Sequence, residues 1–239
     1  MGSPARPAPA QHLILFDIDG TLVDSQAADG EIYLSVLEEV FGFADVSPDW
    51  GAYRHTTDSG ILQEVFEARL GRAPRDFEVA RFRERFVEVI GAAAARAAFL
   101  PIPGAQRMLR DFGALPSHRI GLATGGWREA ARHKLQSAGM RFDDYPSACA
   151  DDAQPRASIM RLAIERAIVH TNGEVPRSIV YVGDGVWDAR ACRVLGLPFI
   201  GIGTGRDAER LRAEGAEAVF PDYSDLPEFC AALQRALRA

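Results

Sequence analysis

Short apolar runs alternate with amphipathic stretches along most of this 239-residue chain. The apolar runs suit buried strands because they are short and continuous, whereas the stretches between them repeat their apolar residues at helical spacing. The predicted strands are residues 13–16, 119–123, 178–182, 199–202 and 218–220. The predicted helices are residues 104–112, 128–138, 157–169, 188–195, 208–214 and 226–237. Strands that alternate with helices predict a parallel sheet covered by helices on both faces.

One region, residues 26–99, breaks this alternation. Its apolar residues recur at helical spacing in EIYLSVLEEVFG, GILQEVFEARLG and FEVARFRERFVEVIGAAAARAAF. The first two of these stretches close with Gly42 and Gly71, and glycine is common just past the end of a helix. We therefore expect a helical cap domain, residues 26–99, inserted into a core domain made of residues 12–25 and 100–239. Residues 1–11, rich in Pro and Ala, are expected to form a disordered tail.

Composition narrows the class of protein without naming an activity. The chain is 47% hydrophobic and 25% charged, which is ordinary for a globular protein. Its net charge of −6 disfavours nucleic acid and anionic membranes as partners. The three cysteines show no metal-ligand spacing, and no stretch resembles a membrane helix or a signal peptide. We expect a cytoplasmic protein that is a monomer or a homodimer.

Acidic residues follow two of the predicted strands at the point where each strand ends. In an open parallel sheet, ligands bind beyond the carboxyl ends of the strands. Asp17 and Asp19 follow the first strand, and Asp184 and Asp188 follow the strand at residues 178–182. Carboxylates gathered there repel one another unless a cation lies between them, and hard oxygen ligands of this kind suit Mg²⁺. Each aspartate alone would also suit a turn or a helix N-cap.

A small, polar turn follows the predicted strand at residues 119–123. Thr124, Gly125 and Gly126 stand directly before the helix that begins near residue 128. A helix N-terminus with small residues exposes backbone N–H groups, which bind anions such as phosphate. The alternative is an ordinary strand-to-helix turn.

Three segments, DIDGTLVDS, LATGG and VGDGVWD, resemble in their order and spacing the motifs of the haloacid dehalogenase superfamily of phosphotransferases. The resemblance covers the chain apart from the first dozen residues, and the helical insert resembles the small cap of that family. It implies an α/β fold, a Rossmann-like doubly wound parallel sheet core with a small α-helical cap domain. Within the family, the build is most similar to the phosphoglycolate-phosphatase-like members.

The resemblance also implies roles for the residues at the strand ends. Asp17 would be the nucleophile that forms an aspartyl-phosphate. Asp19 would protonate the leaving alcohol and then act as base for the attacking water. The ligands of Mg²⁺ would be Asp17, the backbone carbonyl of Asp19, and Asp184, with Asp188 in support. Thr124 and the amides of Gly125 and Gly126 would bind the transferred phosphoryl group.

Two departures from the family pattern concern lysine. The family usually places a lysine, often before a proline, between the second and third motifs, where this chain has Gln154 before Pro155. Arg156 is the expected replacement, although it also suits a simple helix start. Phosphonate-cleaving members use a cap lysine, and the insert contains none; the chain's one lysine, Lys134, is expected on the surface. The presence of Asp19 favours phosphate over carbon–halogen chemistry.

Substrate specificity is expected to come from the insert. Its most polar segment, YRHTTDSGI, offers Arg54 and His55 as candidates for binding the substrate. The alternative is a plain loop in which Asp58 or Ser59 caps the next helix. The sequence thus predicts a Mg²⁺-dependent phosphatase acting on a small phosphorylated metabolite. A phosphomutase acting on sugar phosphates, or a non-catalytic relative that binds a phosphorylated ligand, stays open as an alternative.

Overall fold

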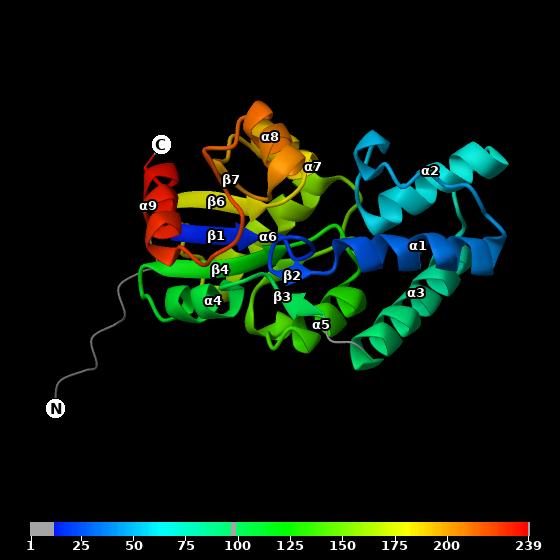
Figure 1. The fold of residues 1–239 in the computed structure, drawn as a ribbon, viewed down its shortest axis with the longest axis horizontal. Helices are drawn as coiled ribbons and strands as arrows, with labels where there is room; N and C mark the ends of the chain where they lie inside the picture. Colours follow the sequence, from blue (N-terminus) through cyan, green and yellow to red (C-terminus); the bar gives the residue numbers. More distant parts are fainter. Residues whose placement is uncertain (1–11, 97–98, 239) are drawn as a thin grey trace.

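The computed structural model describes residues 12–96 and 99–238 of the chain. Six parallel strands form one sheet in the order β5-β4-β1-β6-β7-β8 (Figure 1). The strands are β1 (His12–Phe16), β4 (His118–Ala123), β5 (Ser147–Ala148), β6 (Ser178–Gly183), β7 (Phe199–Ile202) and β8 (Ala218–Phe220). Phe16 lies opposite Leu122 and Val182. The carboxyl ends of the three central strands therefore open at the same edge.

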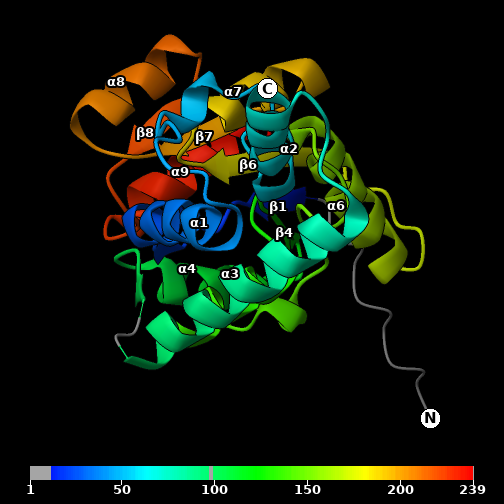
Figure 2. The ribbon, with the colours of Figure 1, turned by 90° about the vertical axis from the view of Figure 1, so that its right-hand side faces the viewer.

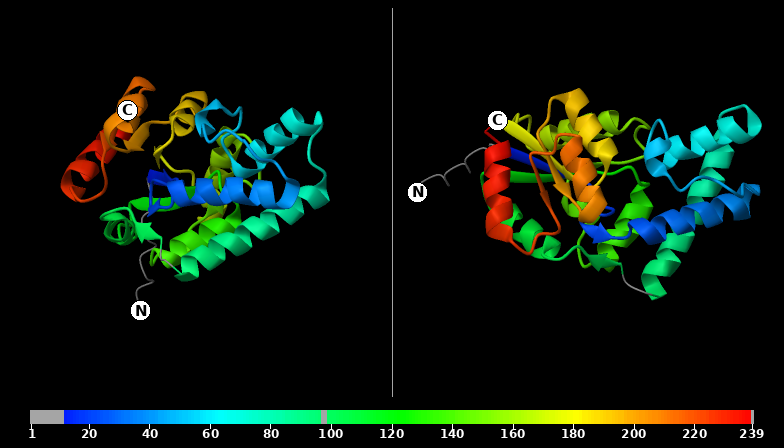
Figure 3. Two further views of the ribbon diagram at one scale, coloured as in Figure 1. Left: turned by 45° about the vertical axis from the view of Figure 1, so that its right-hand side comes forward. Right: turned by 45° about the horizontal axis from the view of Figure 1, so that its top comes forward.

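Helices cover both faces of the sheet, and the alternation of side chains along β1 decides which residues face which layer. Ile14 and Phe16 pack with one set of helices, whereas Leu13 and Leu15 pack with the other. The first set is α4 (Ala105–Gly113), α5 (Arg128–Ser137) and α9 (Leu226–Ala236). The second set is α6 (Arg156–His170), α7 (Val186–Leu195) and α8 (Gly205–Ala213), as the views in Figure 3 show. This arrangement confirms the predicted doubly wound α/β fold.

Three further helices lie beyond the carboxyl ends of the central strands. They are α1 (Gln26–Phe41), α2 (Asp58–Leu70) and α3 (Asp76–Arg96), and Figure 2 views them from their own side. A 3₁₀ turn, Trp50–Ala52, precedes α2. Gly42 and Gly71 end α1 and α2 with φ of 70° and 66°, as their place in the sequence predicted. The division of the chain into a core and a cap domain stays a prediction.

A two-stranded antiparallel ribbon stands where the chain leaves the sheet for α1 and where it returns after α3. Its strands are β2 (Val23–Asp24) and β3 (Leu100–Pro101), and Asp24 pairs with Leu100. The sequence analysis missed both strands, together with the edge strand β5, because two residues are too short to carry a period. The predicted tail, residues 1–11, lies outside the described residues. None of the helices that the structure describes is long and apolar enough to cross a membrane.

Candidate active site

A cavity of about 80 Å³ opens at the carboxyl edge of the sheet, between the core strands and the helices α1 and α2. The loops after β1, β4 and β6, together with the start of α6, supply one wall of this cavity, and residues 26–61 supply the other. The first wall includes Asp17, Asp19, Thr124, Gly125, Arg156 and Asp184. The second includes Asp29, Tyr33, Trp50, Thr57 and Asp58. The structure thus brings the three sequence motifs together, as the strand order required.

Three carboxylates from two strand ends form a compact group in the first wall. Asp17, Asp184 and Asp188 each place an oxygen within 4.8 Å of the other two. The close approach of the first and third motifs depends on Gly20, which has a φ of +71°. A Cβ at Gly20 would lie 2.0 Å from Asp184 Oδ2, so a larger residue there would push the two loops apart.

Arg156 supplies the positive charge that this group needs from the protein. It is the first residue of α6, and Pro155 at the N-cap turns the chain so that the guanidinium enters the group. One nitrogen lies 2.7 Å from Asp17 Oδ2, and Nε lies 2.7 Å from Asp188 Oδ1. Tyr181 accepts a further hydrogen bond from Arg156 at 3.1 Å and donates its own proton to the Ala123 carbonyl. The guanidinium therefore lies between the nucleophile candidate and Asp188, and its role as the replacement for the family lysine stays a prediction.

The carboxylate group fits a divalent cation. Three carboxylates and one guanidinium leave a net charge of −2, which a divalent cation neutralises. Asp17 Oδ1 and Asp184 Oδ1 are buried and have no hydrogen-bond partner among the described residues, although buried oxygens normally have one. Burial raises the pKa of Asp17 to about 7, with Arg156 opposing the rise and Asp188 adding to it. These are the features of ligands whose cation is needed to keep them ionised.

Asp188 and Asp184 differ in how much of their bonding capacity is already used. Both oxygens of Asp188 are engaged, one by Arg156 and the other by the Gly185 N–H at 3.1 Å. Asp184 receives one hydrogen bond, from Gln26 Nε2 at 2.7 Å, and keeps Oδ1 open. Asp184 is thus better placed to bind a cation directly. Asp188 instead holds Arg156 and the Gly185 N–H in position.

The carboxylate of Asp19 is held from two sides. Ser25 donates its hydroxyl proton to Asp19 Oδ1 at 2.5 Å, and Lys134 Nζ lies 2.6 Å from the same oxygen. Lys134 Nζ also lies 2.7 Å from Asp29 Oδ1 on α1. Burial lowers the pKa of Lys134, but Asp19 and Asp29 outweigh burial, so the net pKa is raised and the lysine stays charged. The ion pairs join α5 of the core to α1.

The position of Lys134 corrects the expectation that it lies on the surface. Its side chain is 0% exposed. It belongs to the buried face of α5 with Ala131, Leu135 and Ala138, which are three or four residues apart along the helix. That spacing was present in the sequence, but a lone lysine was interpreted by its residue type and not by its position on the helix.

The turn after β4 presents one hydroxyl and one free amide to the cavity. Thr124 is buried, and its Oγ accepts a hydrogen bond from the Gly126 N–H at 3.1 Å. The Gly125 N–H makes no hydrogen bond with any other described residue, whereas its carbonyl accepts one from the Asp58 N–H. Gly125 thus keeps an amide available for an anion, while the amide of Gly126 holds the turn in shape.

The segment at residues 53–61 enters the cavity through residues other than those expected. Arg54 is 64% exposed and pairs with Glu67, while His55 donates its backbone N–H to Glu64, and neither lines the cavity. The lining residues from this segment are Thr56, Thr57 and Asp58, together with Ile61. The helix α2 is capped by Thr57, whose hydroxyl accepts the Gly60 N–H, and not by Asp58 or Ser59.

The N-terminus of α2 is tied to the core by a row of hydrogen bonds. The hydroxyls of Thr57 and Ser59 donate to the carbonyls of Gln154 and Ala150, at 2.9 and 3.1 Å. Asp58 Oδ2 accepts the Trp127 N–H at 2.8 Å. The structure therefore places α2 against the core loops, which closes the cavity on that side.

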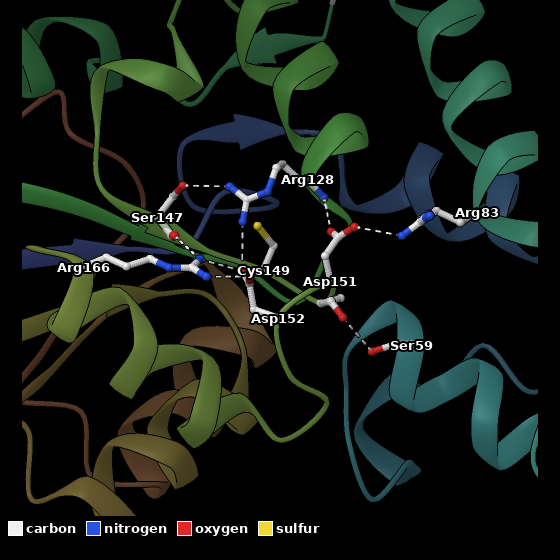
Figure 4. A network of polar contacts seen from close by, with 9 residues as sticks. Ser59, Arg83, Arg128, Ser147, Cys149, Asp151, Asp152 and Arg166 are labelled. Atoms are coloured by element: carbon white, nitrogen blue, oxygen red, sulfur yellow. Dashed lines mark hydrogen bonds and ion pairs between the residues drawn. The ribbon is translucent and has the colours of Figure 1, made fainter. Parts of the chain in front are cut away.

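A network of charged side chains surrounds the loop that contains Ala150 (Figure 4). Asp152 lies between the guanidinium groups of Arg128 and Arg166, with its closest oxygen–nitrogen distances 2.9 and 2.7 Å. Its neighbour Asp151 accepts the Arg128 N–H and pairs with Arg83 of α3 at 3.2 Å. The sequence analysis assigned Asp151 and Asp152 no role. They join α3, α5 and α6 around one loop.

Trp127 fills the apolar contact between α5 and the helices α1 and α3 of the insert. Its side chain is 1% exposed. Its ring stacks on Tyr33 with 6.3 Å between centroids, and Phe82 and Phe86 of α3 meet it at 5.6 and 5.7 Å. Aromatic packing of this extent, beside the ion pairs of Lys134, fixes how the second wall of the cavity faces the first.

Residues 12–196 of the sequence match the haloacid dehalogenase-like hydrolase family. The chain belongs to that family. The sequence expectation of a haloacid dehalogenase-type hydrolase is thereby confirmed. None of the curated proteins matches the chain.

Solved structures of low sequence identity share this fold. A hydrolase from Pseudomonas syringae is 19% identical, with a TM-score of 0.71 over 90% of this chain and 95% of that one. CbbY from Rhodobacter sphaeroides, solved in complex with phosphate, is 18% identical, with a TM-score of 0.68 over 90% and 95%. A putative beta-phosphoglucomutase from Bacteroides vulgatus is 19% identical, with a TM-score of 0.68 over 95% and 90%. At identities this low, the similarity concerns the fold of this haloacid dehalogenase-like chain alone.

Proposed function

We propose that this haloacid dehalogenase-like hydrolase is a Mg²⁺-dependent phosphatase that hydrolyses a small phosphate monoester through an aspartyl-phosphate on Asp17. One observation carries the proposal. Asp17 lies at the cavity with one oxygen held by Arg156 and the other buried without a partner, next to the unpartnered oxygen of Asp184. That arrangement suits a nucleophile that shares a cation with a second carboxylate.

The reaction divides into two displacements at phosphorus. In the first, an oxygen of Asp17 bonds to phosphorus while the bond to the leaving oxygen breaks, and Asp19 gives its proton to that oxygen. In the second, Asp19 takes a proton from water, the water oxygen bonds to phosphorus, and the bond to Asp17 breaks. The contacts of Asp19 with Ser25 and Lys134 hold its carboxyl group in place through both proton transfers.

The ligands of the cation would be Asp17, Asp184 and the backbone carbonyl of Asp19, with Asp188 in support. Mg²⁺ bound there would screen the charge of the phosphate from the carboxylate that attacks it. Arg156 adds a fixed positive charge on the other side of Asp17. The Thr124 hydroxyl and the Gly125 N–H are the protein groups that can bind the phosphoryl oxygens.

A phosphomutase acting on sugar phosphates is the second candidate, because a putative beta-phosphoglucomutase shares the fold. A mutase must bind a phosphate that is not being transferred, which normally requires arginine or lysine. Among the described residues that line the cavity, Arg156 is the only such residue, and Asp17 and Asp188 already engage it. This favours transfer of the phosphoryl group to water.

The three cysteines are unpaired, in keeping with the cytoplasmic location expected from the sequence.

Release of inorganic phosphate from p-nitrophenyl phosphate in the presence of Mg²⁺ tests the proposal. We expect turnover by the native chain and none by Asp17→Asn, which preserves the shape of the side chain and removes the nucleophile. Glu64→Gln, an isosteric change on α2 outside the cavity, is the matched control and retains activity. Turnover by Asp17→Asn at the native rate would exclude the aspartyl-phosphate. A folded native chain without turnover would favour a phospholigand-binding relative.

A further inference from the structure

We infer that the alcohol released by this enzyme carries a cationic amino group, so that the substrate is a small aminoalkyl phosphate. The inference rests on the proposed phosphatase function and concerns the half of the cavity that binds the leaving group. That half is formed by α1, α2 and the 3₁₀ turn before α2. Its charged groups are carboxylates, and they face the space that a leaving group must occupy.

Asp29 and Asp58 are the two carboxylates in this wall. Asp29 binds Lys134 through Oδ1, and Asp58 accepts the Trp127 N–H through Oδ2. The second oxygen of each makes no hydrogen bond with another described residue, yet neither belongs to the fully buried oxygens without a partner. Both residues line the cavity, so these oxygens are available to a ligand that binds there. Asp58 is only 7% exposed, so it has little access to bulk water.

The charges around the leaving-group oxygen do not balance without a ligand. Lys134 already binds two carboxylates, Asp19 and Asp29, and Arg156 binds two others, Asp17 and Asp188. No cation among the described residues that line the cavity is therefore left for the carboxylate of Asp58. A buried carboxylate without a counter-ion is unfavourable, and an ammonium group on the substrate would supply the missing charge. Burial raises the pKa of Asp58 well above its ordinary value, with Asp29 adding to the rise, so its charged form is favoured only when a cation binds beside it.

The wall also lacks what an anionic leaving group would need. No arginine or lysine from the described part of residues 26–96 lines the cavity, and Arg54 points away from it. A carboxylate or a second phosphate would therefore meet Asp29 and Asp58 without a partner of its own. The cavity is also lined by Trp50 of the 3₁₀ turn and by Trp187 of α7, and tryptophan is the side chain that attracts ammonium groups most strongly.

A set of three matched monoesters tests the inference. The esters are 2-aminoethyl phosphate, 2-hydroxyethyl phosphate and carboxymethyl phosphate, which share the phosphate and a leaving group of similar size but differ in its charge. We expect kcat/KM to be at least tenfold higher for the amine than for the neutral ester, a difference of about 1.4 kcal/mol in transition-state binding. Carboxymethyl phosphate, whose leaving group carries a carboxylate, should be the poorest substrate. Any other order overturns the inference.

Removal of the charge of Asp58 tests whether this carboxylate is the source of the preference for the amine. In Asp58→Asn, which keeps an oxygen for the Trp127 N–H, the preference for the amine over the neutral ester should fall about tenfold, chiefly through a higher KM for the amine. Glu64→Gln removes a carboxylate from the same helix outside the cavity and should keep the native preference. An Asp58→Asn enzyme with an unchanged preference contradicts the inference.

The failure of the proposed function would look different. In that case neither the three esters nor p-nitrophenyl phosphate would release phosphate with Mg²⁺. Turnover of p-nitrophenyl phosphate with carboxymethyl phosphate as the best ester would leave the phosphatase intact and overturn only the aminoalkyl class.

Discussion

Two buried cations, Arg156 and Lys134, each bind a pair of carboxylates in this protein. Arg156 holds the nucleophile candidate Asp17 together with Asp188, and Lys134 holds the candidate acid Asp19 together with Asp29. A buried ion pair is costly to break because the remaining charge stays in a medium of low polarity. The two carboxylates that would act on the substrate are thus positioned by separate cations.

The first prediction concerns Arg156. Arg156→Ala should lower kcat about 10²-fold or more, because it removes a preorganised charge beside Asp17. Arg156→Lys restores one charge but cannot reach Asp17 and Asp188 in the same fork geometry, and it should recover only part of the loss. Steady-state kinetics at saturating Mg²⁺ measures both variants, with circular dichroism to show that they fold. Full activity in Arg156→Ala would mean that another cation positions Asp17.

The second prediction concerns Lys134. Lys134→Met should lower the free energy of unfolding by about 3–5 kcal/mol, because it leaves Asp19 and Asp29 buried without their cation. Urea denaturation measures the loss.

The burial of Lys134 has its own check, because it is the one lysine in the sequence. An amine-reactive reagent should leave Lys134 unlabelled in the native protein and label it in urea, as mass spectrometry of the peptide that contains Lys134 would show. Equal labelling of Lys134 in the native state would place it on the surface after all.

The structure brings together those predicted site residues whose positions follow from the strand order. Asp17, Asp184 and Arg156 follow strand ends or begin a helix, so topology alone brings them together. Arg54 was chosen for its charge in a polar loop, and its long side chain reached solvent and Glu67 instead. Asp29 was missed because it lies in an amphipathic helix, where an acidic residue normally faces water.

At the scale of secondary-structure elements, α5 does most to connect the core with the insert. Trp127 at its start packs on Tyr33 and α3. Lys134, further along the same helix, forms an ion pair with Asp29 of α1. The loop after β5 adds the network around Asp152 (Figure 4). These contacts come from residues far apart in the sequence, so no local pattern predicts them.

The third prediction concerns Trp127. Trp127→Ala should lower the free energy of unfolding by about 3–5 kcal/mol, since it empties a site enclosed by Tyr33, Phe82 and Phe86. Trp127→Phe keeps an aromatic ring and should cost less than half as much. Chemical denaturation followed by circular dichroism compares the two. A loss below about 1 kcal/mol for the alanine variant would contradict the tight packing.

The fourth prediction concerns the acid stability that Asp152 provides. Burial alone would raise its pKa, but hydrogen bonds from Arg166 and the Cys149 N–H lower it below its ordinary value. A depressed pKa in the folded state stabilises the protein above about pH 4, and this contribution disappears as the pH falls through the folded value. Asp152→Asn should therefore lose about 1–2 kcal/mol at pH 7 and little at pH 2.5. Urea titrations at both pH values measure the difference, and an equal loss at both would contradict it.

The fold was predictable where the helices and strands are long enough to show a repeating pattern of apolar residues. All five strands proposed from the sequence are present, and β7 and β8 match in both bounds. The helix α8 begins at Gly205, three residues before the predicted start, because the polar residues of its first turn carry no apolar pattern. The two-residue strands β2, β3 and β5 exist only through their partners.

At the scale of the whole molecule, the chain keeps an acidic centre under a cover of three helices. The carboxylates of both cavity walls outnumber the two buried cations, Arg156 and Lys134. Repulsion among them disfavours the folded state, so we predict that a divalent cation, when bound among them, stabilises the native state.

The fifth prediction is this dependence on metal. Mg²⁺ at 100 times its Kd should stabilise the fold by about 2.7 kcal/mol, which raises Tm by about 5–11 °C for a chain of this length. Asp184→Asn should abolish most of the rise. Thermal melts with NaCl at matched ionic strength provide the control. The same rise in Asp184→Asn, or none in the native chain, would contradict the cation site.

The ribbon of β2 and β3 has a consequence for how such a protein is assembled over evolutionary time. Asp24 and Leu100 are paired across the two strands, so the two ends of the segment between them lie side by side, as the arms of a hairpin do. A segment whose ends already meet can be lengthened, shortened or exchanged for an unrelated one without changing the register of any central strand. A lineage can in this way acquire new substrates by replacing the helical insert as a module, while the residues of the reaction centre in the sheet domain are inherited unchanged.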